Sequence, residues 1–371
     1  MTRRELLALL GAATLRGNPD APTAPVAVSR CPSYEEDQTA LLSRMFDQIG
    51  GLGRLVKNKT VTVKLNLTGS PALRVQGLPL GVTHYSHPKM VGAVVHLLGA
   101  AGARRVRLVE SGYGTAAPLE EYILDSGWNL RALASAAPVV EFENTNAIGN
   151  GKKYTRLAVP GGGYIYPAYD LNHSYEDTDV FVTMAKLKNH ATCGITLALK
   201  NSFGITPSSI YGDDAGADEP NEKPTKGRVE VCHLGKRQPA RSAPREIDPD
   251  SNRDPGYRVP RIIADLVAVR PIHLSIIDGI GTLAGGEGPW IPGIRHVRPG
   301  VVVVGTNPVT ADAVATAIMG YNPRANRGEV PFTECDNTML LAEAKGIGTA
   351  DLAKIEVIGV PIADAVYQFP S

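Results

Sequence analysis

The segment from Met184 to His190 carries the side chains best suited to chemistry in this sequence. At the two-residue period of a β-strand, an apolar face gives way to Lys186, then Lys188, and then His190. Ammonium groups at the end of an apolar face require anions, because an unpaired buried charge is costly. A carboxylate or a phosphate would fit there, and a lysine whose pKa is lowered by its neighbours could act as a base. The alternative is a solvated strand end whose lysines reach water.

Other polar residues follow neighbouring elements at the point where each is expected to end. In open α/β sheets, ligands bind outside the carboxyl ends of the strands, so polar residues there are stronger candidates for ligand binding than polar residues elsewhere. The predicted catalytic residues are Lys186, His190 and Lys200. The predicted substrate-binding residues are Lys64, Asn66, Lys188 and Asn201.

A divalent metal is a second hypothesis for the same region. His84 and His87 precede an expected helix, and Asp278 and Glu287 flank a glycine-dense loop. Carboxylates and imidazoles are metal ligands, so Asp278, Glu287 and His87 are the predicted metal-binding residues. The alternatives are that the histidines only shape a loop and that the glycines only make turns. The identity of the metal stays open.

The four cysteines occur at isolated positions: Cys31, Cys193, Cys232 and Cys335. No two of them have a C-x-x-C spacing, so the sequence contains no iron–sulfur or zinc-ribbon motif. Cys193 follows His190 by three residues, but a lone cysteine is more often a small buried apolar residue.

Composition narrows the classes of partner. The 38 Lys and Arg residues are balanced by 37 Asp and Glu residues, which excludes a general polyanion-binding surface, and we expect no nucleic-acid partner. No apolar run is long enough to span a bilayer, so no integral membrane segment is expected. A small anionic molecule is the expected partner, and the oligomeric state stays open, a homo-oligomer included.

The first 25 residues are treated apart from the fold. Arg3 and Arg4 precede a short apolar segment, as in twin-arginine export signals, which would place the protein in the periplasm. Arg16 interrupts that segment and no clear A-x-A cleavage site follows. The alternative is an amphipathic helix and a linker, which would leave a cytoplasmic protein.

From Val26 onward, expected strands alternate with expected helices, which predicts an α/β fold. We expect a mostly parallel or mixed sheet with helices on both faces, in one large domain over residues 26–371 that could divide into two lobes. Residues 206–260 carry many prolines and charges without apolar periodicity, so they are predicted to be a surface excursion, with a lid as one reading. The expected strands are Val61–Leu67, Arg105–Glu110, Val139–Asn144, Arg156–Val159, Asp179–Lys188, Ile272–Asp278, Val301–Gly305 and Ile355–Val360. The expected helices are Tyr34–Ile49, Pro88–Ala101, Cys193–Phe203, Arg261–Val269 and Pro308–Met319.

Several of these segments together resemble the family known as domain of unknown function 362, in the family's order from about residue 60 to 320. The matching pieces are Val63–Asn66, the helix from His87-Pro88 to Gly99–Ala103, Ala185–His190, Thr196–Gly204, Ile277–Gly279 with Glu287–Pro289, and Asn307–Ala315. The resemblance supports the site reading of the lysine-rich segment but implies no settled activity. Some members carry a ferredoxin-type segment, whose cysteine spacings are absent here. A distant similarity to the nickel-pincer lactate racemase class is an analogy that transfers no function.

The sequence thus favours an enzyme that acts on an anionic small molecule. Proton transfer next to a carboxylate, as in an isomerase or lyase, fits lysine and histidine better than hydrolysis, for which no activated Ser or Cys elbow is present. The alternatives are a non-catalytic protein that binds an anion or a metal, and a redox accessory protein.

Overall fold

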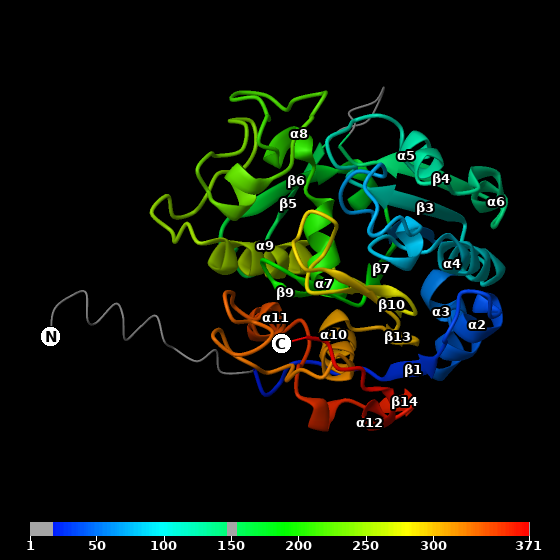
Figure 1. The fold of residues 1–371 in the computed structure, drawn as a ribbon. Helices are drawn as coiled ribbons and strands as arrows, with labels where there is room; N and C mark the ends of the chain where they lie inside the picture. Colours follow the sequence, from blue (N-terminus) through cyan, green and yellow to red (C-terminus); the bar gives the residue numbers. More distant parts are fainter. Residues whose placement is uncertain (1–17, 147–153, 371) are drawn as a thin grey trace, which may run out of the picture.

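The computed structural model describes residues 18–146 and 154–370, and an eight-stranded sheet crosses the molecule (Figure 1). The strands lie in the order β14 (Val357–Gly359), β1 (Val26–Arg30), β13 (Val301–Gly305), β10 (Leu274–Gly279), β7 (Val180–Lys186), β2 (Thr60–Lys64), β3 (Arg105–Glu110) and β4 (Val140–Asn144). The expected twin-arginine signal falls almost entirely on residues 1–17, which lie outside the described residues.

Five neighbouring strands form a parallel block that positions the polar residues. β10, β7, β2, β3 and β4 pair in parallel, whereas β13 is antiparallel to both β10 and β1. The carboxyl ends of the parallel strands therefore lie on one edge of the sheet. That edge carries Lys64, Glu110, Lys186 and Asp278. The sheet is mixed, as predicted.

Helices cover both faces of the sheet, which confirms the expected fold class. On β7, Phe181 belongs to one hydrophobic cluster, while Val180 and Val182 belong to the other, because side chains alternate along a strand. One cluster includes α2 (Gln38–Gln48), α4 (Pro88–Ala100), α5 (Leu119–Asp125) and α6 (Leu130–Ala134). The other includes α7 (Ala198–Asn201), α9 (Pro255–Val269), α10 (Pro308–Ile318) and α11 (Thr338–Ala344). Shorter helices are α3 (Gly53–Val56), α8 (Ser208–Tyr211) and α12 (Ile362–Ala365).

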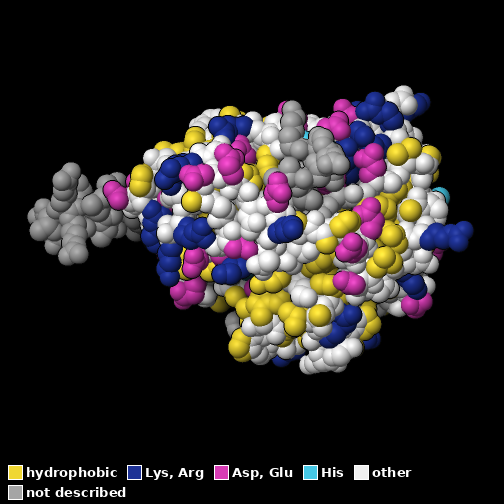
Figure 2. Space-filling view, turned by 90° about the horizontal axis from the view of Figure 1, so that it is seen from above, with side chains coloured by type: hydrophobic (Ala, Val, Ile, Leu, Met, Phe, Trp, Pro, Cys, Tyr) yellow, Lys and Arg dark blue, Asp and Glu magenta, His cyan; other side chains and the backbone are white. Residues whose placement is uncertain are grey.

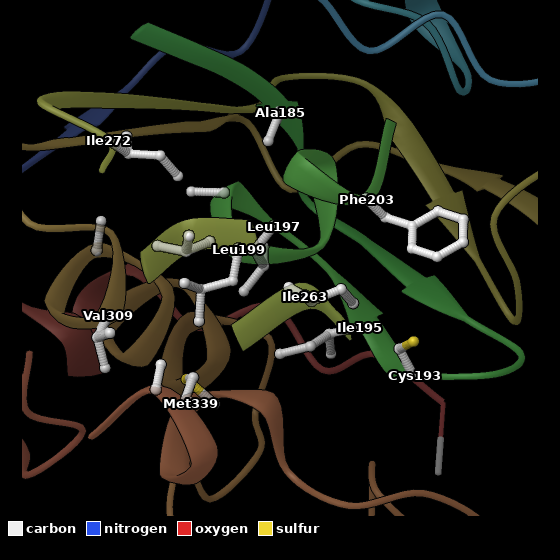
Figure 3. Close-up of a cluster of buried hydrophobic side chains, with 14 of the residues drawn as sticks. Ala185, Cys193, Ile195, Leu197, Leu199, Phe203, Ile263, Ile272, Val309 and Met339 are labelled. Atoms are coloured by element: carbon white, nitrogen blue, oxygen red, sulfur yellow. The ribbon is translucent and has the colours of Figure 1, made fainter. Parts of the chain in front are cut away.

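The segment after β7 differs from the predicted helix Cys193–Phe203. A hairpin, β8 (Lys188–His190) with β9 (Gly194–Thr196), leaves the sheet, and only then does the short α7 begin. Gly194 has φ +72°, a conformation that closes the turn and that other residues rarely adopt. In Figure 3 the apolar side chains of β9 and α7 lie among those of α9, α10 and α11. Packing therefore overrides helix periodicity in this segment.

Two other hairpins lie beside the main sheet. β5 (Tyr154–Ala158) pairs with β6 (Ala168–Asn172), and β11 (Thr282–Ala284) pairs with β12 (Arg295–Val297). The loop that joins β11 to β12 contains the glycine-dense segment of the sequence. It carries Glu287 and Trp290.

The excursion at 206–260 is not purely a surface feature. It contains a π-helical turn, Val229–His233, in which Val231 and Cys232 are fully buried. α9 begins at Pro255 rather than at the predicted Arg261, although Pro260 lies inside it. A proline there cannot donate to the Gly256 carbonyl. The Asp336 N–H donates to that oxygen instead, at 2.9 Å, which is a contact from outside the helix that periodicity cannot reveal.

The charged side chains on the surface are mixed in sign, as the balanced composition predicts. Figure 2 shows Lys and Arg side chains interspersed with Asp and Glu on the face seen from above. Within the described ranges, no helix combines the length and the apolar character that crossing a membrane requires.

Candidate functional site

A cavity of about 400 Å³ opens at the carboxyl edge of the parallel strands. A volume in this range is typical of small-molecule sites. Among the described residues, four cationic side chains line it against two carboxylates: Lys64, Lys188, Lys200 and Arg228 against Glu110 and Glu287. Of the ten predicted site residues, the cavity brings together Lys64, Asn66, Lys188, His190, Lys200, Asn201 and Glu287.

Lys64 and Glu110 form a buried ion pair at the ends of β2 and β3. Lys64 Nζ lies 2.5 Å from Glu110 Oε1 and also donates to the Leu65 carbonyl at 2.7 Å. Glu110 in turn accepts the backbone N–H of Ser111 and of Leu67. Burial lowers the pKa of Lys64, and the attraction of Glu110 opposes that shift. Both charges are engaged, so this pair forms a wall of the cavity rather than a free anion-binding group.

Lys188 is fully buried and, among the described residues, faces no carboxylate at hydrogen-bond distance. Its Nζ donates to the backbone carbonyls of His84 at 3.1 Å and of Glu287 at 3.0 Å. Burial lowers the pKa of Lys188 to about 7, an effect that the nearby Lys200 reinforces and the Glu287 charge opposes. Lysines tuned to this range are suited to general base catalysis near neutral pH.

Lys200 has a free ammonium group that is accessible from the cavity. Within the described part of the chain, its Nζ has neither a hydrogen bond nor an ion pair, and it lies 4.7 Å from the centre of the Phe203 ring. Arg228 Cζ lies 6.0 Å from the same ring centre. Arg228 is anchored through Nε to the Thr206 carbonyl at 2.8 Å and through a further bond to the Ser111 hydroxyl. Both distances fall in the range of cation–π contacts.

His190 and Glu287 lie together at the cavity wall. Glu287 Oε2 is 3.7 Å from His190 Nδ1 and accepts the Ala191 N–H at 2.9 Å. The Thr192 N–H donates to His190 Nδ1 at 3.0 Å, so a neutral ring carries its proton on Nε2. Burial and the Lys200 charge hold the pKa of His190 well below its usual value. Burial opposes ionisation of Glu287, but a protonated His190 and the N–H groups of Ala191 and Trp290 lower its pKa.

Asn66 and Asn201 connect the loop after β2 to α7. Asn66 Nδ2 donates to Asn201 Oδ1 at 2.9 Å, and Asn201 Nδ2 donates to Thr183 Oγ1 at 2.8 Å. Asp312 fixes the other end of α7 by accepting the backbone N–H groups of Ala198 and Leu199, at 2.8 and 2.9 Å. These contacts hold α7, and with it Lys200, at the cavity.

Three predicted residues do not reach the cavity: Lys186, His87 and Asp278. Lys186 Nζ lies 2.9 Å from Asp278 Oδ2, 2.7 Å from the Tyr34 hydroxyl, and within bonding distance of the Gly81 and Gly281 carbonyls. The His87 ring is stacked on Tyr34 with 3.6 Å between centres. Lys186 is paired in register with Asp278, so its charge is neutralised inside the sheet, whereas Lys188 leaves with the β8–β9 hairpin. The two-residue period of a single strand therefore wrongly placed Lys186 in the same site as Lys188.

The predicted metal ligands are also separated. Glu287 lies at the cavity with His190, whereas Asp278 and His87 belong to the cluster around Tyr34. Among the described residues, no group of three or more His, Cys, Asp or Glu side chains is arranged to hold a metal ion. The four cysteines are free and buried.

Sequence reasoning left several cavity residues out of the predicted set. Glu110 was recognised as a strand-end residue but received no role. Arg228 and His233 come from the excursion, where no periodicity distinguished them. Phe203 and Trp290 look like ordinary core or loop residues in the sequence. The sequence signal for Phe203 was its position three residues after Lys200, close enough for a cation–π contact.

Comparison with known proteins now places the chain in a family. The model of the family described as Domain of unknown function (DUF362) matches residues 61–317, so the chain belongs to this family, as the motifs indicated. The thylakoid-associated protein sll1697 of Synechocystis sp. is 29% identical over 203 residues, which are 52% of this chain and 55% of that protein. This chain therefore spans about half the length of that curated relative.

Two solved structures show a more distant likeness. One is a structural-genomics target from Thermotoga maritima, with 14% identity and a TM-score of 0.34, covering 72% of this chain and 55% of that chain. The other is the lactate racemase apoprotein from Thermoanaerobacterium thermosaccharolyticum, with 10% identity and a TM-score of 0.34, covering 76% of this chain and 56% of that chain. Likenesses at this level carry no functional argument.

Proposed function

We propose that this protein is an enzyme that binds a small molecule with a carboxylate or phosphate group in the cavity and transfers a proton on it. One observation carries the proposal: Lys200 presents an ammonium group without a partner among the described residues, in a cavity where cations outnumber carboxylates. An unpaired charge in such a site is stabilised by a ligand of opposite sign.

The anion would contact Lys200 and Arg228. Both cations lie beside the Phe203 ring, which does not neutralise their charges. Lys64 contributes less, because Glu110 already engages its charge. The neighbouring Asn66 and Asn201 amides complete a polar wall.

The proton-transfer groups would be Lys188 and His190. Within the described part of the chain no carboxylate bonds the Lys188 ammonium, and its pKa is about 7, so its neutral form is available as a base. The neutral His190 ring would donate from Nε2, because Nδ1 is occupied by the Thr192 N–H. A base and a neutral donor facing one anion-binding cavity fit an isomerase or a lyase.

Sulfate binding tests the anion site. Sulfate keeps the same charge over the pH range of interest, and its affinity is measured by isothermal titration calorimetry. We expect Lys200→Met to weaken binding by about 10- to 100-fold, since a hydrogen bond to a charged group contributes about 1.5–3 kcal/mol. Lys226→Met, at an exposed lysine near the cavity but not lining it, is the matched control. Equal affinity in the two variants would reject the site.

Hydrogen exchange tests catalysis separately. The protein is incubated in D₂O with small carboxylic acids, and loss of the proton next to the carboxylate is followed by ¹H NMR. Exchange that persists in Lys226→Met but disappears in Lys188→Met supports the proposed base. Binding without exchange of any bound acid would leave the non-catalytic binding protein as the better description.

A further inference from the structure

Exposed apolar side chains are concentrated at the mouth of the cavity. Among the described residues, four of the large hydrophobic side chains that remain exposed also line it, with exposed fractions of 43–52%: Leu73, Tyr113, Val229 and Trp290. We call these four residues the collar. Exposed apolar side chains that line a polar cavity are typical of a binding site.

The collar is assembled from four separate segments of the chain. Leu73 follows β2, Tyr113 follows β3, Val229 belongs to the π-helical turn, and Trp290 lies between β11 and β12. Such convergence is not explained by one exposed loop.

Two of the aromatic rings are held against glycines. Trp290 Nε1 donates to Glu287 Oε1 at 3.0 Å, and a Cβ on Gly69 or Gly288 would come within 2.3 Å of the indole ring. The ring therefore lies directly on the backbone at both positions. A Cβ on Gly227 would lie 3.4 Å from the Tyr113 ring. Trp290 therefore has a defined position against the backbone, whereas Tyr113 is only within ordinary van der Waals distance of a Cβ at Gly227.

Polarity changes with depth in the cavity. Lys188 is fully buried, while the collar residues are about half exposed. A ligand that only carried charge would leave the collar in water. We infer that the ligand is an amphipathic anion, with a carboxylate or phosphate head group near Lys200 and an apolar body between the collar residues. This inference rests on the anion site proposed above.

A chain-length series tests the inference. Acetate, butyrate, hexanoate and octanoate are titrated into the protein by calorimetry. Burying one CH₂ group contributes about 0.8 kcal/mol, so affinity should rise by up to about fourfold for each methylene that becomes buried. An unchanged affinity from acetate to octanoate would overturn the inference.

Matched double variants locate the apolar contact. Leu73→Ser combined with Val229→Ser should reduce the increase in affinity from acetate to octanoate, which we call the gain. Leu124→Ser combined with Val139→Ser removes the same residue types at exposed positions away from the cavity, and should keep the gain. A gain that survives in the collar variant would contradict the assignment. Because all four positions are exposed, folding is expected to survive, and a circular dichroism melt checks it.

Fluorescence gives an independent readout. The chain has two tryptophans, and Trp128 is buried, so Trp128→Phe leaves Trp290 as the reporter. Octanoate should shift its emission to shorter wavelength, and acetate should not. An octanoate spectrum identical to that of acetate would contradict contact with the collar.

The series separates the two proposals and the two sources of ligand. If neither sulfate nor any acid binds, the anion site itself fails. If sulfate binds but chain length adds nothing, only the amphipathic ligand fails. Co-flotation with phosphatidylcholine vesicles containing phosphatidic acid would support an amphipath held in a membrane, whereas octanoate binding without vesicle binding would support a free acid.

Discussion

Lys64 and Glu110 meet at the ends of adjacent parallel strands, with 2.5 Å between Nζ and Oε1 and both side chains almost fully buried. Removing one partner of a buried pair leaves an uncompensated charge. We expect Glu110→Gln to lower the free energy of unfolding by about 3–5 kcal/mol in urea titrations. Glu35→Gln, which breaks the exposed pair with Lys89, should cost less than about 1 kcal/mol. Similar losses in both variants would contradict this contrast.

Lys186→Met should affect the fold rather than the cavity. Its ammonium is bonded to Asp278, Tyr34 and two carbonyls away from the cavity. We expect a loss of about 3–5 kcal/mol of stability with little change in sulfate affinity at a temperature where the variant is folded. Combining it with Asp278→Leu should recover part of the stability. A large loss of sulfate binding in a folded Lys186→Met protein would restore the residue to the site.

Anion binding should weaken as the pH rises through 7. The pKa of Lys188 is lowered by burial to about 7, so its positive charge is present below that value and lost above it. Sulfate affinity of the wild-type protein should fall between about pH 6 and pH 8, because an anion held by Lys200 and Arg228 loses the attraction of the nearby Lys188 charge. Lys188→Met should bind sulfate with an affinity that does not change between these pH values. Equal pH dependence in the variant would assign the titration to another group.

Asp312 should make stability fall with rising pH. Burial raises the pKa of this carboxyl to about 8, although the N–H groups of Ala198 and Leu199 oppose the shift. Between its ordinary unfolded value of about 3.9 and about 8, the folded protein holds a proton that the unfolded chain has lost. Each pH unit in that window therefore removes up to about 1.4 kcal/mol of stability.

The Asp312→Asn variant isolates this effect. Urea titrations at about pH 5 and pH 7 give the difference in unfolding free energy between wild type and variant at each pH. We expect the unfolding free energy of the wild type, relative to that of the variant, to be lower at about pH 7 than at about pH 5. Parallel curves would show that the carboxyl is already ionised in the folded state.

The alternation of strands and helices was enough to predict the α/β sheet, and strands such as Arg105–Glu110 and Val301–Gly305 were predicted to the residue. Ligand binding at strand carboxyl ends also led to Lys64 and Lys188. What local patterns could not provide were long-range partners. The cross-strand partner Asp278 removes Lys186 from the cavity. Arg228 is held at the cavity by the Thr206 carbonyl and the Ser111 hydroxyl, which are distant in sequence.

β1 lies between β13 and β14, so both partners of the strand at Val26–Arg30 come from the last part of the chain. During synthesis at about 5–20 residues per second, β1 waits on the order of tens of seconds before Val301–Gly305 emerges. Its buried residues Val26, Ala27 and Val28 stay without their sheet partners over that interval. Strand edges left open in this way invite aggregation, so refolding yield should depend steeply on protein concentration. Among the described residues, the last one that lines the cavity, Trp290, precedes both β13 and β14, so the whole lining is synthesised before β1 finds its sheet partners.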